Sequence, residues 1–204
     1  MKRFLVSGFI LCAALAAACT PSSEVSNSPA SASDACEGAT ASGAREKFSF
    51  SQISECLDTP QKMNAFVLNN MQWVPDFDQQ NFNGNVYLPA EEVYRNGADD
   101  CDGMAEFIAC VLSRHGYEAY NVGISVNRPW GFNVAGYVGE DGKKYAIINK
   151  AQPDGPFDSW EALAQAYIDA GLAEPDGVVW LFQPCLEKRV DGDAVLALEH
   201  QVIR

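Results

Sequence analysis

Apolar residues recur at helical spacing in several separate stretches of the chain. We predict helices over 60–72, 89–95, 104–112 and 158–170. The first begins at Pro60, a favoured first helical residue, and the last is capped by Asp158 or Ser159. The third runs out at His115-Gly116, a typical helix end.

The second half of the chain has β-like patterning. Strands are expected over 118–126, 131–138, 143–149 and 177–182, while 194–203 is ambiguous between helix and strand. Gly139-Glu140-Asp141-Gly142 is a strong hairpin signal between two of these strands. Helices that precede an antiparallel sheet predict an α+β domain.

The first residues have the pattern of a targeting signal. Lys2-Arg3 precede an apolar run, Phe4 to Ala17, that is too short to span a bilayer comfortably. Ala16-Ala17-Ala18-Cys19 resembles the lipobox of bacterial lipoproteins, which implies cleavage before Cys19 and acylation of that cysteine. Ordinary signal-peptidase cleavage is the alternative. By resemblance to enteric lipoproteins, Thr20 in place of an aspartate after the cysteine implies anchoring in the outer membrane, facing the periplasm.

Composition divides the chain into three parts. We expect a signal peptide over 1–18, a flexible Ser/Ala/Pro/Gly-rich tether over 19–45 and one folded domain over 46–204. Nothing after residue 18 has the length and apolar character to cross a bilayer. The net charge of −13 argues against nucleic acid or an anionic membrane surface as partner. Contact with the membrane is expected only through the lipid anchor.

Besides Cys19, the mature chain would hold an odd number of cysteines: Cys36, Cys56, Cys101, Cys110 and Cys185. Export makes disulfides possible, and we favour a bond between Cys36 and Cys56 that would clip the tether to the domain. Cys110 lies on the apolar face of its helix and is interpreted as a buried core residue. Cys101 is then either free or bonded to Cys36 or Cys185.

Cys101 follows an acidic turn and opens the helix over 104–112. A helix N-terminus stabilises a thiolate, which favours a nucleophile, whereas Asp99, Asp100 and Asp102 oppose thiolate formation. Asp100 is expected to cap the helix. The acidic residues match only part of a calcium loop, whose twelfth position is Ala109 here, so no metal site is predicted.

These residues resemble the transglutaminase-like superfamily, and most closely the bacterial transglutaminase-like cysteine proteinases. The resemblance covers residues 60–150 and is carried by Trp73-Val74, Leu88-Pro89-Ala90-Glu91-Glu92, Gly97-Ala98-Asp99-Asp100-Cys101-Asp102 and Arg114-His115-Gly116. The family pattern is Pro-x-Glu followed by Gly-x-Gly-Asp-Cys-Glu-Asp. Asp99 replaces its second glycine, and Asp102-Gly103 replace the final Glu-Asp. The resemblance implies a papain-like fold with the cysteine at a helix N-terminus, packed on an antiparallel sheet.

In that family a histidine on the next strand and an aspartate after the following one complete the site. The resemblance puts Phe132 at the histidine position, or Asn133 if the register slips by one, and Asn149 at the aspartate position. None of these side chains is a general base. The chain has two histidines. His115 lies at the far end of the cysteine helix, roughly 20 Å away, and His200 lies outside the motif.

The leading interpretation is therefore a non-catalytic binding or scaffold module for a peptide or another cell-envelope protein, without a cofactor. The alternative is an active cysteine peptidase or acyltransferase that uses Cys101 with His200 or an unconventional base. Candidates to line a groove beside Cys101, or else to be ordinary core, are Asp100, Trp130, Phe132, Tyr137 and Trp180. Trp73 is expected in the core beneath the first helix.

Overall fold

The computed structural model describes residues 35–75, 86–126, 131–148, 154–191, 194 and 198–203. Its helices are α2 (Phe50–Cys56), α3 (Pro60–Asn70), α4 (Ala90–Asn96), α5 (Cys101–Arg114) and α6 (Trp160–Asp169), and a 3-10 turn, η1, spans Ala44–Glu46. The larger strands are β4 (Ala119–Ser125), β5 (Phe132–Val138), β6 (Lys144–Ile147), β7 (Asp154–Phe157), β8 (Val178–Phe182) and β10 (His200–Ile203). Short strands are β1 (Gln72–Trp73), β2 (Val86–Tyr87), β3 (Ala98–Asp99) and β9 (Val190–Asp191).

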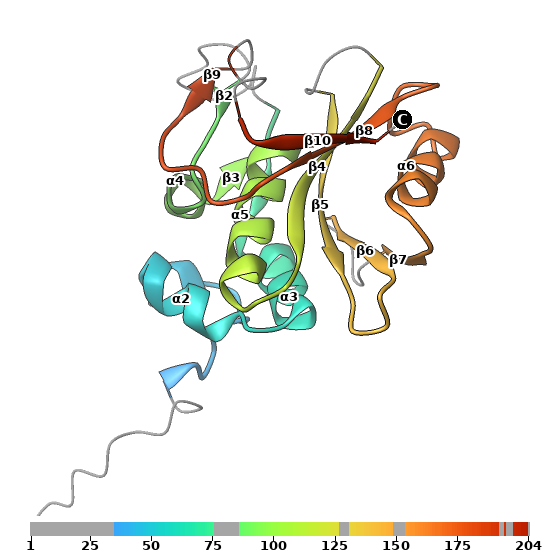
Figure 1. Cartoon of the computed structure of the whole chain (residues 1–204). Coiled ribbons are helices and arrows are strands. Elements are labelled where there is room, and N and C mark those ends of the chain that lie inside the picture. The colour runs from blue at the N-terminus through green and yellow to red at the C-terminus, as the bar shows by residue number, and fades with distance from the viewer. Residues whose placement is uncertain are drawn as a thin grey trace, which may run out of the picture.

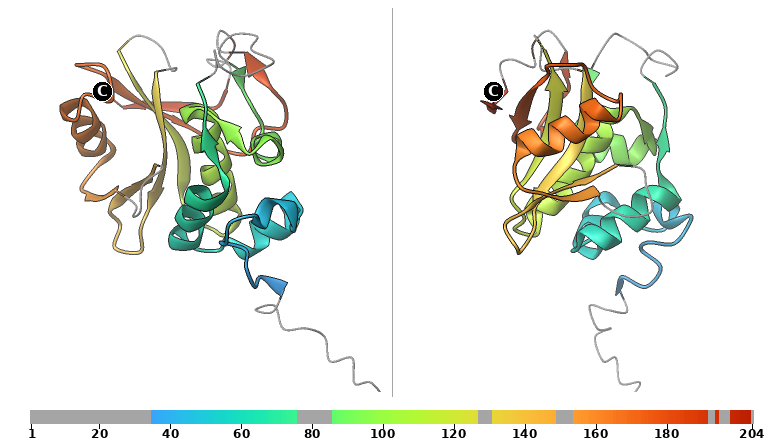
Figure 2. Two further views of the ribbon diagram at one scale, coloured as in Figure 1. Left: turned by 180° about the vertical axis from the view of Figure 1, so that it is seen from behind. Right: turned by 90° about the vertical axis from the view of Figure 1, so that its right-hand side faces the viewer.

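A six-stranded antiparallel sheet in the order β10-β8-β4-β5-β6-β7 forms the middle layer. Helix α6 covers one face of this sheet, and α5 with the N-terminal helices covers the other (Figures 1 and 2). Two small ladders lie beside it: β1 pairs with β3 in parallel, and β2 pairs with β9 in antiparallel orientation. The expected combination of helices with an antiparallel sheet is confirmed.

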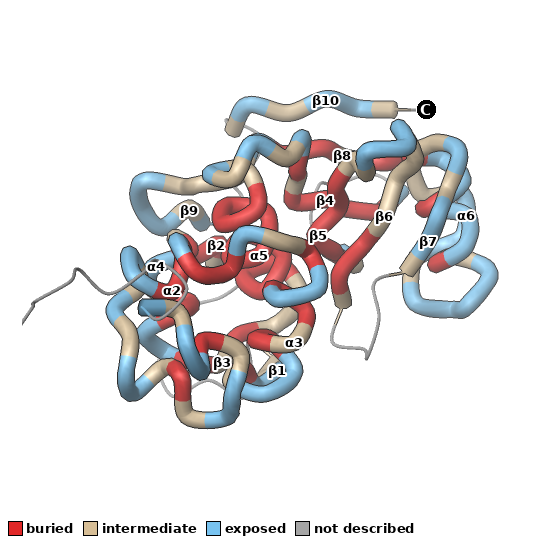
Figure 3. The backbone as a smooth tube through the Cα atoms, turned by 90° about the horizontal axis from the view of Figure 1, so that it is seen from below, coloured by how far each residue is buried: buried red, intermediate tan, exposed pale blue. Residues whose placement is uncertain are grey.

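Helix α5 is the central element of the fold. Every residue from Asp102 to Leu112 is buried, as the red tube in Figure 3 shows. A helix that is buried all round must be covered on every side, and here α3, α4 and the sheet cover it. On β4 the positions that face α5 are small or polar, among them Ala119, Asn121 and Gly123, which leaves room for the helix to lie close to the strand.

The sheet separates two apolar clusters. On the α5 side, Tyr94 and Phe107 pack against each other and against both Phe50 and Phe66, with ring centroids 5.7–6.4 Å apart. On the α6 side, buried side chains of the central strands meet one face of α6: Val122, Ile124, Val134, Val179, Leu181, Trp160, Leu163 and Tyr167. Successive residues of a strand point to opposite faces, so β5 supplies both clusters.

The predicted helices are confirmed, with changes at their ends. Thr59 caps α3 by accepting the N–H of Lys62 at 3.3 Å. Ser159 caps α6 by accepting the N–H of Ala162 at 3.2 Å, while the carboxylate of Asp158 pairs with the lysine Lys143. The ambiguous C-terminal stretch forms the edge strand β10, and both α2 and β7 were not predicted.

The folded domain begins before residue 46, where the sequence predicts its start. Ala39 and Ala44 are buried in the α5-side cluster. Arg45 donates from Nε to the carbonyl oxygen of Tyr94 at 2.8 Å, which ties this segment to the end of α4. Residues 36–45 therefore belong to the folded part and not to a tether.

The cysteines confirm one pairing and correct another interpretation. Cys36 and Cys56 are bonded as expected. Cys110 is not an unpaired core residue, because it is bonded to Cys185. This second bond joins the middle of α5 to the segment that follows β8, and Cys101 remains a free thiol.

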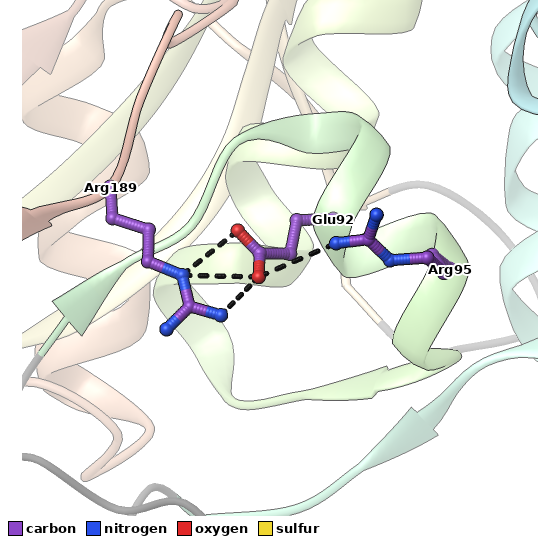
Figure 4. Close-up of polar contacts among 3 residues, drawn as sticks. All are labelled: Glu92, Arg95 and Arg189. Atoms are coloured by element: carbon purple, nitrogen blue, oxygen red, sulfur yellow. Dashed lines mark hydrogen bonds and ion pairs between the residues drawn. The ribbon is translucent and has the colours of Figure 1, made fainter.

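An ion-pair network holds this C-terminal segment against α4. The Nε of Arg189 lies 3.0 Å from both carboxylate oxygens of Glu92, its Nη2 contacts the same group, and Arg95 approaches that carboxylate at 3.5 Å (Figure 4). Arg189 holds the pKa of Glu92 below its usual range. The network fixes the turn into β9, which in turn pairs with β2.

None of the helices in the described part of the chain has the length and apolar character that crossing a bilayer would require.

Candidate functional site

Cys101 is the first residue of α5, and an acidic turn caps the helix in front of it. Asp100 accepts the N–H of Asp102 at 3.2 Å, as predicted for a capping residue. Asp99 accepts the N–H of Asp100 at 3.0 Å, and Asp102 accepts that of Gly103 at 2.6 Å. Carboxylates of the turn thus satisfy two of the free N–H groups at the helix start, those of Asp102 and Gly103.

The thiol lies against the beginning of β5. Its Sγ lies 3.7 Å from the carbonyl oxygen of Gly131, as a donor, and accepts from the backbone N–H of Asn133. Burial, followed by the carboxylates of Asp100 and Asp102, raises the pKa of the Cys101 thiol to about 12. The N–H donors favour the thiolate, but they do not outweigh burial and the two negative charges.

This protonated state predicts slow alkylation of Cys101. Because the thiolate is the nucleophile, we expect iodoacetamide at pH 8 to react with the folded protein about 1,000-fold more slowly than with the unfolded chain. The rate should keep rising with pH beyond 9, towards the pKa of about 12. Samples quenched at successive times and digested give both rates from the mass-spectrometric signal of the alkylated Cys101 peptide. An alkylation rate that stops rising with pH below pH 8 would contradict the raised pKa of Cys101.

The two residues considered for the histidine position, Phe132 and Asn133, have side chains on opposite faces of the sheet. Phe132 packs against Tyr167 of α6, with ring centroids 5.1 Å apart, so its side chain lies on the far face of the sheet. Asn133 is the residue whose side chain lies on the α5 face. Of the two residues considered for that position, Asn133 is therefore the one whose side chain lies on the same face of the sheet as Cys101.

Asn133 belongs to a buried polar cluster beside the cysteine. Its Nδ2 donates to Oδ1 of Asn121 at 2.8 Å and lies 3.5 Å from the hydroxyl of Tyr87. Asn121 in turn donates to the backbone carbonyl of Asp102 at 3.1 Å. The carbonyl is only an acceptor, which fixes the orientation of both amides. The side chain nearest the expected position of a base is thus an amide that ties β5 to α5.

Neither histidine is near the thiol. His115, at the other end of α5, has its Nε2 2.6 Å from the carbonyl oxygen of Ser54. His200 lies on the edge strand β10, with its Nδ1 2.7 Å from the carbonyl of Leu198 and its ring against Trp180 and Phe182. Two strands, β8 and β4, stand between β10 and β5, which separates the backbones by about 14 Å.

The remaining predicted site residues are scattered. Trp180 lies on the α5 face of β8, two strands from Asn133, and its indole Nε1 is buried without a hydrogen-bond partner among the described residues. Tyr137 packs between Tyr117 and Tyr145 towards the other end of β5. Cys19, Trp130 and Asn149 lie outside the described residues.

An apolar cavity of about 380 Å³ opens beside the thiol. We call it the Cys101 cavity. Its lining is apolar apart from Cys101 and Asn133, and it comes from α3, β1, α5, β5, β6 and the turn after α6. Of the groove candidates among the described residues, Phe132 lines this cavity, whereas Asp100, Tyr137 and Trp180 do not. The lining residues that matter below are Val67, Trp73, Met104, Ile108, Ile147 and Leu172.

Trp73 is a site residue that sequence reasoning missed. It is 53% exposed at this cavity and not in the core beneath α3, so the earlier interpretation is wrong. Its strand pairs with β3, where Trp73 is opposite Asp99. Its position in the matched Trp73-Val74 pair was the one signal that could have marked it. Leu172, 47% exposed on another wall of the cavity, had no such signal.

Within the described residues, one group of side chains has metal-ligand character: Asp99, Asp100 and Asp102, whose oxygens lie within 4.8 Å of one another. The hydrogen bonds described above engage one oxygen of each carboxylate with backbone N–H groups at the start of α5. The group is explained as a helix start, and it also places negative charge next to the thiol.

No protein-family model matches this chain, and no curated protein sequence is significantly similar to it.

Proposed function

We propose that this protein is a non-catalytic binding module of the bacterial cell envelope, attached through a lipid on Cys19. Its domain would have a transglutaminase-like, papain-like fold that keeps the cysteine and lacks the base. The partner would be a peptide or a segment of another envelope protein, held in the cleft beside Cys101.

The neighbours of the thiol carry this proposal. Amide-bond cleavage by a cysteine requires a group that removes the thiol proton and later protonates the leaving amine. Around Cys101 stand a carbonyl oxygen, the backbone N–H and side-chain amide of Asn133, and the carboxylates of Asp100 and Asp102. The first three do not take up a proton near neutral pH, and the negative charges of the two carboxylates oppose formation of the thiolate. Loss of such a base costs several orders of magnitude in rate, on the order of 10⁴ to 10⁶.

Two departures from the family pattern support the resemblance because they compensate each other. A Cβ atom added to Gly103 would lie 2.2 Å from Oδ2 of Asp99. The carboxylate of Asp99 therefore fills the space that a side chain at position 103 would need. A glycine at 99 with an aspartate at 103, as in the family, and the reverse arrangement here are two ways to fill one space.

The active alternative has less support. It requires His200 to reach Cys101, but His200 is hydrogen-bonded to Leu198 and packed on Phe182. The antiparallel pairing of β10 with β8 holds the backbone of His200 opposite Phe182. An unconventional base would have to come from elsewhere.

Restoring a base at position 133 tests the proposal. An Asn133→His variant would place an imidazole on the strand whose backbone already contacts Sγ. We expect its alkylation rate at pH 7 to rise at least about 100-fold, because the imidazole would stabilise the thiolate. Mass spectrometry of Cys101 measures the rate, and circular dichroism checks the fold.

Asn133→Ala is the matched control, because it loses the same hydrogen bonds to Asn121 and Tyr87 without supplying a base. The control should react as slowly as the natural protein. The proposal is wrong if the natural protein hydrolyses a peptide or ester and a Cys101→Ser substitution abolishes that turnover.

A further inference from the structure

Two large apolar side chains that line the Cys101 cavity are exposed to solvent, unlike the residues of a packed core. Five large apolar side chains of the described residues are exposed, and two of them, Trp73 and Leu172, line this one cavity. The indole of Trp73 comes from the α3–β1 side and Leu172 from the turn after α6. Exposed apolar groups gathered at a hollow typically mark a ligand site.

The interior of the cavity fits an apolar group. Its walls include Met104 and Ile108 of α5, Ile147 of β6 and Val67 of α3. A volume of about 380 Å³ lies in the range of small-ligand sites, roughly 300–1,000 Å³. A large aliphatic or aromatic side chain that enters this space leaves water and contacts hydrocarbon on several sides.

Negative charge near Cys101 favours a ligand that carries a positive charge next to its apolar group. Asp100 does not line the cavity itself, but it is half-buried and adjoins Cys101, which does; Asp99 and Asp102 are buried next to it in the chain. None of the described residues that line the cavity is a lysine or an arginine, and the chain as a whole carries −13. This field repels fatty acids and anionic lipid headgroups and attracts cations.

The geometry points to a cationic, apolar peptide segment as the ligand of the Cys101 cavity: a large apolar side chain enters between Trp73 and Leu172, and a neighbouring Lys or Arg meets Asp100. This inference names the ligand class of the binding function proposed above and rests on it. Binding is reversible and makes no bond to Cys101.

Three synthetic pentapeptides test the ligand class with the full-length protein in calorimetric titrations. They are acetyl-Ala-Lys-Phe-Lys-Ala-amide, the same peptide with Ser in place of Phe, and the same peptide with Glu in place of both lysines. We expect each replacement to weaken binding at least about tenfold, because the first removes the apolar contact and the second reverses the charge. Raising the salt concentration should weaken binding of the first peptide.

Variants of the protein locate the site. Trp73→Ser and Leu172→Ser should each weaken binding of the Lys-Phe-Lys peptide about tenfold. Leu68→Ser is the matched control, because Leu68 is 40% exposed on α3 and does not line the cavity. Asp100→Asn keeps a capping side chain and should weaken binding, whereas Glu140→Gln, in the β5–β6 hairpin, removes one charge elsewhere and should not.

The inference fails if the Glu peptide or a fatty acid binds more tightly than the Lys-Phe-Lys peptide, or if Leu68→Ser weakens binding as much as Trp73→Ser does. It also fails if none of the peptides binds. That outcome would not contradict the proposal that the domain is non-catalytic. Cleavage of the bound peptide that depends on Cys101 would instead overturn the proposed non-catalytic function and leave the ligand class standing.

Discussion

Replacing Cys110 and Cys185 together by alanine should lower the free energy of unfolding by about 4 kcal/mol, because the bond closes a loop of 75 residues in the unfolded chain. The loop spans everything from the middle of α5 to the end of β8, which includes most of the sheet. Urea titrations under non-oxidising conditions, followed by circular dichroism, measure the change.

The Cys36→Ala/Cys56→Ala double variant is the comparison. Its bond closes a separation of only 20 residues, for which the same chain-entropy argument gives about 3 kcal/mol. We also expect this variant to loosen η1 more than the sheet, which amide hydrogen exchange would show. Equal stability of the natural protein and the Cys110/Cys185 variant would mean that the unfolded chain gains nothing from losing the bond.

The stability of the protein should fall as the pH rises from about 4.5 to about 7, because of Glu106. This α5 residue is 1% exposed, and its Oε1 accepts the N–H of Leu186 at 2.7 Å. Burial raises the pKa of the carboxyl to about 7, against the opposing effect of the N–H groups of Leu186 and Cys185. The folded chain therefore binds this proton more tightly than the unfolded chain does.

The sign follows from proton linkage. Between pH 4.5 and 7 the folded state holds more protons at Glu106, so the free energy of unfolding decreases with rising pH, by up to about 3 kcal/mol. Glu106→Gln should remove this slope, whatever its effect on the absolute stability. Urea titrations at several pH values measure the slope, and Glu91→Gln on α4 is the control. A slope that persists in Glu106→Gln would assign it to other groups.

Local signals in the sequence were enough to predict the four helices described above and the capping role of the acidic turn before Cys101. Helix starts depend on one capping residue and a few spacings, as at Thr59 and Asp100. The strand register was harder. In β5 every residue from Asn133 to Tyr137 is buried, so apolar residues occur on both faces and the alternation that would fix the register is missing.

Other features depend on partners distant in the chain. Five candidate cysteines allow several pairings, and spacing alone does not choose Cys185 for Cys110. β7 contains Gly155-Pro156, a sequence that reads as a turn and is tolerated because β7 is an edge strand. The exposure of Trp73 likewise depends on how α3 and β3 pack around it. The sequence could not predict it, because a large apolar residue is usually expected to be buried.

The Cys36–Cys56 bond has a mechanical consequence. A pulling force applied through the chain before residue 35 enters the fold at Cys36 and passes through the covalent bond to Cys56, at the end of α2. The bond bypasses residues 37–55, so they cannot be unravelled one after another from the N-terminal side. Cys36 packs against the main apolar cluster and Cys56 is buried in it, so tension from the N-terminal side acts directly on the core of the domain.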